Sequence, residues 1–105
     1  MTTWSIEALT GYKPITTFWE DFSIAEAFGD DAVRDTYNRA MDEWKSDYRY
    51  LTELVMVLNW KIWEHFDRGS DRLAAVYNEL WSAADKYACE HLTDEELAYF
   101  YDTTD

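Results

Sequence analysis

The chain has 105 residues, of which 48% are hydrophobic, and its 22 acidic residues against nine basic ones give a net charge of −13. This length suits a single domain, 1–105, and the hydrophobic content argues against a disordered chain. The charge argues against direct binding to nucleic acid or to an anionic membrane, because phosphate groups are bound by clustered Lys and Arg.

Residues 1–14 are predicted to form an N-terminal arm, since Gly11 and Pro14 interrupt regular structure. Apolar residues spaced along the arm could anchor it to the body of the protein: Trp4, Ile6, Leu9 and Tyr12. The segment lacks the basic region and apolar block of a signal peptide. The single cysteine, Cys89, suits a reducing compartment, so we expect a cytoplasmic protein.

A first helix is predicted at about 17–28. Two pairs of residues have the spacing of a capping box, Thr17 with Glu20 and Ser23 with Glu26, and each pair could satisfy backbone N–H groups at a helix start. Gly29 then suits a left-handed helix stop.

Residues 30–68 contain no Gly or Pro and carry apolar side chains at a mean spacing close to the helical period. These positions are Val33, Tyr37, Ala40, Trp44, Tyr48, Leu51, Val55, Leu58, Ile62 and Phe66. The unbroken phase favours one central helix over about 31–67, which would be about 55 Å long. Because that exceeds the width of a small globule, the alternative is two helices with a break at Ser46–Asp47, where both residues favour a helix start.

Gly69 and Ser70 are predicted to end this region and to begin a third helix at about 71–91. Thr93 with Glu96 forms a further capping box, which predicts a short terminal helix. The sequence thus predicts an all-α bundle of four to five helices. No segment has the roughly 20 apolar residues of a membrane span.

The least polar stretch, "LVMVLNWKIW" at 54–63, has apolar residues on two faces of its helix. At 100° per residue, Trp60 lies almost opposite the main stripe, with Met56 and Trp63 beside it. One interpretation is a central helix that neighbours cover on both faces. The other is that Met56, Trp60 and Trp63 form a surface for a homodimer or another protein, because Trp is enriched at the centres of interfaces.

Residues that could perform catalysis or bind a cofactor or metal form no recognisable motif. The position three residues before His65 is Ile62, and the position three before His91 is Ala88, so the Glu-x-x-His pattern of di-iron bundles is absent. Cys89 projects from the polar side of its helix, and the nearby Asp85 disfavours a reactive thiolate. We therefore expect no metal, no cofactor and no enzymatic activity.

Negative charge is concentrated towards the two ends of the chain, since 1–33 and 73–105 hold 14 acidic residues and two basic ones. Such a surface could imitate a nucleic-acid backbone and block a DNA- or RNA-binding protein. The residues proposed for this role are Asp85, Glu90, Asp94, Glu95 and Glu96. The alternative is that the charge only promotes solubility.

Three segments, "TGYKPITTFWEDFSIAEAFG", "YLTELVMVLNWKIWEHF" and "LAYFYDTTD", resemble small uncharacterised acidic proteins encoded on conjugative and phage-like mobile elements of gut Firmicutes. The resemblance covers most of the chain and implies a bacterial, cytoplasmic setting. It also favours the mimic hypothesis, since mobile elements often encode small acidic inhibitors of host defence. The leading expectation is a non-enzymatic protein-interaction or accessory module that self-associates.

Overall fold

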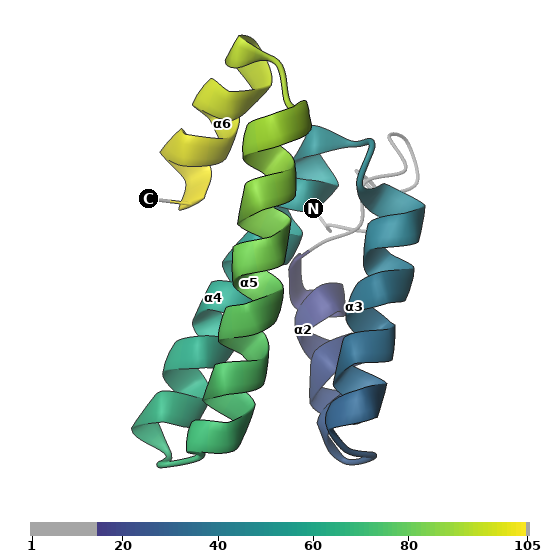
Figure 1. Ribbon diagram of the computed structural model, residues 1–105, viewed down its shortest axis with the longest axis vertical. Helices are drawn as coiled ribbons and strands as arrows, with labels where there is room; N and C mark the ends of the chain where they lie inside the picture. Colours follow the sequence, from purple (N-terminus) through teal and green to yellow (C-terminus); the bar gives the residue numbers. More distant parts are fainter. Residues whose placement is uncertain (1–14, 105) are drawn as a thin grey trace, which may run out of the picture.

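The computed structural model describes residues 15–104, and this part of the chain folds into five helices that run alternately in opposite directions (Figure 1). The helices are α2 (Ile15–Glu26), α3 (Asp30–Trp44), α4 (Tyr48–Asp67), α5 (Asp71–His91) and α6 (Asp94–Thr104). No strand occurs within the described residues. The prediction of an all-α bundle is therefore confirmed, and the predicted third helix has the bounds of α5.

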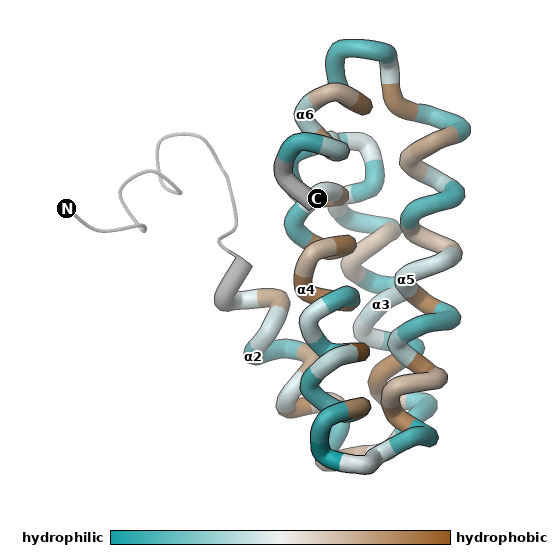
Figure 2. The backbone as a smooth tube through the Cα atoms, turned by 90° about the vertical axis from the view of Figure 1, so that its left-hand side faces the viewer, coloured by the Kyte–Doolittle hydropathy of each residue, from teal (hydrophilic) through white to brown (hydrophobic). Residues whose placement is uncertain are grey.

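The helices form two hairpins, α2–α3 and α4–α5, and α6 folds back against α4 (Figure 1). α4 occupies the middle of the bundle, because it packs against α5 most extensively and also contacts α2, α3 and α6. Hydrophobic and hydrophilic segments alternate with the turns of α5, which gives it one apolar face towards α4 (Figure 2). The amphipathic period of the sequence thus determines which face of each helix is buried.

Aromatic rings fill the centre of the core between the hairpins. Phe22 of α2 is fully buried and meets Tyr77 of α5 edge-on, at 5.7 Å between ring centroids. Phe18 meets Tyr50 in the same way at 6.4 Å, and Trp44 stacks on Tyr50 at 4.0 Å. Edge-on and stacked rings therefore join α2, α3, α4 and α5 into one core.

The central region is two helices, so the preference for one continuous helix over 31–67 was wrong and the alternative break near Ser46 is correct. α3 ends at Trp44, and Asp47 caps α4 by accepting a hydrogen bond from the Arg49 N–H at 2.9 Å. The molecule measures 37 Å along its longest axis, which is shorter than the predicted continuous helix. Folding back at this point lets both halves bury their apolar faces.

Helix ends agree with the sequence at two places. Gly69 has a φ of 77°, and the Ser70 and Gly69 N–H groups donate to the carbonyls of His65 and Phe66 in a Schellman pattern. At α6, the Thr93 N–H donates to Glu96 and the Glu96 N–H donates to the Thr93 hydroxyl, so this capping box is confirmed.

The two capping boxes predicted for the first helix were wrong. Thr17 and Ser23 both lie inside α2, which begins at Ile15. Gly29 has a φ of 113°, as its predicted turn role requires, but it is the residue that precedes α3 rather than a left-handed stop directly after α2. The predicted arm of residues 1–14 lies outside the described part of the chain. None of the helices between 15 and 104 combines the length and the apolar content of a membrane span.

Candidate interaction surface

α4 is covered on two sides, as its two apolar faces predict. The side with Leu54 and Leu58 packs into the bundle, and Val57 on the flank is also fully buried. α5 and α2 both contact this helix. The interpretation of a covered central helix therefore holds for most of its circumference.

One side of α4 remains open and carries three large aromatic residues. Trp60 is 47% exposed, Trp63 is 58% exposed and Phe66 is 61% exposed. Trp63 and Phe66 meet edge-on at 6.0 Å between centroids, and Trp60 meets Trp19 of α2 at 6.2 Å. Together, Trp60, Trp63 and Phe66 form a surface that we call the aromatic stripe.

The predicted interaction residues fall on or beside this stripe. Trp60 and Trp63 belong to it, while Met56 is partly buried one turn earlier on the same side of α4. Phe66 was wrongly predicted to belong to the buried stripe. At 100° per residue it lies about 80° round the helix from Leu58, which moves it out of the core and next to Trp63.

Charged side chains are buried close to the aromatic stripe and join α4 to α2. The side chain of Lys61 is 1% exposed, and its Nζ lies 3.1 Å from Glu26 Oε2 and 3.4 Å from Glu64 Oε2. The same Nζ donates to the Ser23 hydroxyl at 2.7 Å and lies 4.2 Å above the Trp19 ring. Lys61 thereby fixes the part of α2 that supports Trp60.

Glu26 is the acceptor on which this buried cluster converges. The Tyr77 hydroxyl donates to Glu26 Oε2 at 2.5 Å, and Lys61 Nζ and His65 Nε2 lie 3.1 and 3.0 Å from the same oxygen. Burial alone would raise the pKa of Glu26, but the groups facing it together lower that pKa below 4.5. Burial and the Glu26 carboxylate raise the pKa of Tyr77, so its hydroxyl stays a donor.

Glu26, Glu64 and His65 also form a set that could ligate a metal, since one donor atom from each lies within 4.8 Å of the others. His65 is 4% exposed, and within the described part of the chain no hydrogen bond of good geometry reaches its Nε2. The Lys61 ammonium, however, already lies against both carboxylates. A metal ion would have to displace this buried cation, so the arrangement is best described as an ion-pair network.

Sequence reasoning missed this cluster because its members look unrelated along the chain. Ser23 and Glu26 have the spacing of a capping box, and Lys61 lies within the least polar stretch of the chain. The available signal was that Lys61 and His65 are four residues apart on the same side as buried leucines. A charged residue at such a position needs a partner from a neighbouring helix.

The residues considered for chemistry stand apart from one another. His91 is exposed and stacks on Tyr87 at 4.2 Å, whereas His65 is buried in the ion-pair network. Cys89 is exposed, as predicted, with its Sγ 3.2 Å from the Tyr101 hydroxyl. Neither histidine lines the cavity of about 450 Å³ between α2 and α3.

The five residues of the acidic hypothesis lie on α5 and at the start of α6. Glu90, Asp94 and Glu95 are exposed, while Asp85 is partly buried and Glu96 is engaged in the capping box. Among residues 15–104, no ion pair joins any of these five carboxylates to a basic side chain. Three of them, Glu90, Asp94 and Glu95, are therefore available to form a negative surface.

Glu53 on α4 gives the protein a pH dependence that can be measured. Burial raises the pKa of Glu53 to about 7, and its Oε2 has no hydrogen-bond partner among residues 15–104. In the unfolded chain this carboxyl ionises near pH 4.5, so the folded state holds its proton more tightly. The stability it contributes is present below pH 4.5 and is lost as the pH rises towards 7.

We therefore expect Glu53→Gln to increase stability at pH 7.5 by roughly 1–2 kcal/mol, since partial exposure to water screens part of the shift. At pH 4 the variant and the native chain should be equally stable within about 0.5 kcal/mol. Urea unfolding at both pH values measures this difference. Equal stability of the two proteins at pH 7.5 would contradict it.

No protein-family model, curated protein or solved structure matches this chain.

Proposed function

We propose that this protein is a non-enzymatic interaction module that self-associates through the aromatic stripe on α4. In line with the resemblance described above, we place it in the bacterial cytoplasm, in an accessory role for a mobile element. The observation that carries the proposal is the exposure of Trp60, Trp63 and Phe66 side by side on one helix. Tryptophan contributes a large share of the binding energy at interface centres.

The surroundings of the stripe support a packed interface. Trp60 is held by its contact with Trp19, and Lys61 lies over that same Trp19 ring. Aromatic side chains that are held in place before binding lose little conformational entropy when a partner covers them. Met56, partly buried on the same side, adds an adaptable apolar contact.

Sedimentation velocity over a concentration series tests the proposal. Trp63→Ala should raise the dimer dissociation constant at least tenfold, because truncation of a central Trp costs about 2 kcal/mol or more. Phe28→Ala is the matched control, since Phe28 is 79% exposed in the turn between α2 and α3 and lies outside the stripe. A native chain that stays monomeric at millimolar concentration, or equal dissociation constants for the two variants, would refute self-association through the stripe.

The second candidate function is inhibition of a DNA- or RNA-binding protein by the exposed carboxylates Glu90, Asp94 and Glu95. Their lack of ion pairs within residues 15–104 favours it. The dependence of binding on salt concentration distinguishes the two functions. The affinity of an electrostatic mimic for its target falls steeply as ionic strength rises, whereas the affinity across an aromatic interface changes little. Measuring the affinity of this protein for its binding partner at 50 mM and 500 mM NaCl therefore distinguishes the mimic from the aromatic interface.

A further inference from the structure

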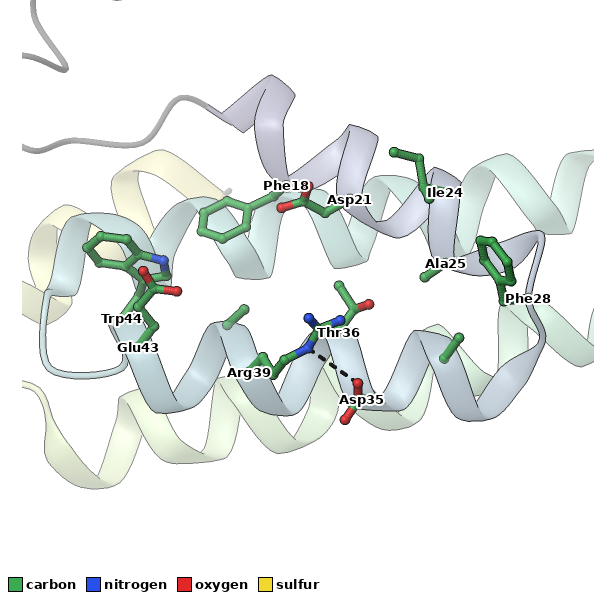
Figure 3. A pocket seen from close by; sticks show the side chains of 12 residues that line it. Phe18, Asp21, Ile24, Ala25, Phe28, Asp35, Thr36, Arg39, Glu43 and Trp44 are labelled. Carbon is green, nitrogen blue, oxygen red and sulfur yellow. Dashed lines mark ion pairs between the residues drawn. The ribbon is translucent and has the colours of Figure 1, made fainter.

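A groove separate from the aromatic stripe runs between α2 and α3. Its volume is about 450 Å³, and all its lining residues come from α2, α3 and the turn between them. Phe18 and Trp44 lie at one end, and Phe28 lies at the other (Figure 3). Ile24 is 63% exposed and Phe28 is 79% exposed, so large apolar surface borders the groove.

The middle of the groove is lined by small side chains. Ala25 comes from α2, and Ala32, Thr36 and Ala40 follow one another along α3 at intervals of four residues. Small residues allow the backbone of another helix to approach closely. α3 has 15 residues, so the groove offers a track of roughly 22 Å, or about four helical turns.

The walls of the groove are negatively charged. Asp35 and Glu43 of α3 line it, and Arg39 between them forms an ion pair with Asp35 at 3.3 Å. Residues 15–44 contain eight acidic side chains and two basic ones. The second basic residue, Arg34, pairs with Glu79 of α5 and does not line the groove. Glu26 and Asp30 are paired with Lys61 and Arg72. The negative charge of the groove therefore comes from its lining residues, which are Asp21, Asp35 and Glu43 against Arg39.

We propose that this groove binds an amphipathic α-helix of another protein, with apolar residues at i, i+3 or i+4, and i+7, flanked by Lys or Arg. The large rings at the two ends and the small residues between them match a helix laid along α3 with its apolar face inward. Acidic walls beside this apolar track select basic flanks by charge complementarity. A second copy of this chain fits less well, because its charge of −13 would face the same negative walls.

Titration with two synthetic 18-residue peptides tests this proposal. The first has Leu at helical spacing with Lys beside it, and the second has the same composition in an order that removes the apolar face. Isothermal titration calorimetry at 150 mM NaCl should show the first peptide binding at least tenfold more tightly. The double variant Ile24→Ser/Phe28→Ser should lose at least tenfold in affinity for it, whereas Trp63→Ser, on the aromatic stripe, should bind as the native chain does.

Equal affinity for the two peptides would show charge attraction alone and would overturn the proposal. So would unchanged binding by the Ile24→Ser/Phe28→Ser variant. If the Ile24→Ser/Phe28→Ser variant instead self-associates less than the native chain in the absence of peptide, the groove binds a second copy of this chain, and the proposal of a basic partner helix is wrong. NMR shifts of the Ala32 and Ala40 methyl groups in the native chain on titration with the first peptide provide a test that needs no variant, and absence of those shifts would also overturn it. None of these outcomes depends on whether Trp63→Ala affects dimerisation.

Discussion

Replacing Lys61 with Met should lower the free energy of unfolding by about 3–5 kcal/mol, the usual cost of removing one partner from a buried ion pair. The side chain of Lys61 is 1% exposed, while those of Glu26 and Glu64 are 16% and 18% exposed. Without the ammonium, these two carboxylates keep their partial burial but lose the cation between them. Met matches the length and flexibility of the lysine stem, so packing changes little. Chemical denaturation followed by circular dichroism measures the loss.

The pH dependence of this loss distinguishes charge from packing. Lys61 is one of the groups that lower the pKa of Glu26, so the stability that their contact contributes is lost as the pH falls below 4.5 and Glu26 takes up a proton. The destabilisation by Lys61→Met should therefore be smaller at low pH than at pH 7. Lys86→Met, on the exposed side of α5, is the matched control and should change stability by less than about 0.5 kcal/mol. A Lys61→Met protein as stable as the Lys86→Met protein at pH 7 would show that the ion-pair network contributes nothing to folding.

Phe22→Ala should cost about 3–5 kcal/mol, which is typical for removal of a buried ring. Phe22 is fully buried, and its edge-on contact with Tyr77 links α2 to α5. Part of the loss comes from the cavity that the missing ring leaves between these helices. Since small domains are stable by only about 5–15 kcal/mol, the variant should unfold at a much lower denaturant concentration.

Phe28→Ala is the matched control for this experiment, because Phe28 lies only six residues further along the chain and is 79% exposed. We expect its stability to stay within about 0.5 kcal/mol of the native chain. Comparable losses of unfolding free energy in Phe22→Ala and Phe28→Ala would mean that α2 does not pack as described. A loss in the Phe22 variant alone would confirm its place in the core.

Helical periodicity was sufficient to predict the fold class and the bounds of α5. It could not decide whether 31–67 is one helix or two, because a new helix can continue the phase of the old one by coincidence. The deciding factors are the Asp47 cap and the stacking of Trp44 on Tyr50, which brings α3 and α4 together. The cap at Asp47 is indicated by the sequence as an alternative helix start, whereas the stacking of Trp44 on Tyr50 depends on the turn that it stabilises, so local pattern does not reveal it.

Trp60 and Trp63 could be identified as candidate interface residues because they fall opposite the main apolar stripe. Phe66 could not be identified in the same way, since its exposure depends on how far the neighbouring helices extend along α4. The spacing of Lys61 and His65 indicates that Lys61 needs a partner, but the partners themselves could not be predicted, because the network joins Glu26, Lys61 and Tyr77 from three helices. Glu26, Lys61 and Tyr77 come within contact distance of one another only once α2 has packed against α4 and α5.

The short connections between consecutive helices have a consequence for folding kinetics. α2 and α3 are separated by three residues, as are α3 and α4, and α4 and α5, while two residues separate α5 from α6. Most of the native contacts therefore join neighbours along the chain, and domains with such low contact order fold within microseconds to milliseconds. During synthesis, the side of α4 that carries Leu54 and Leu58 would remain uncovered only until α5 has emerged, which limits the time in which it could aggregate.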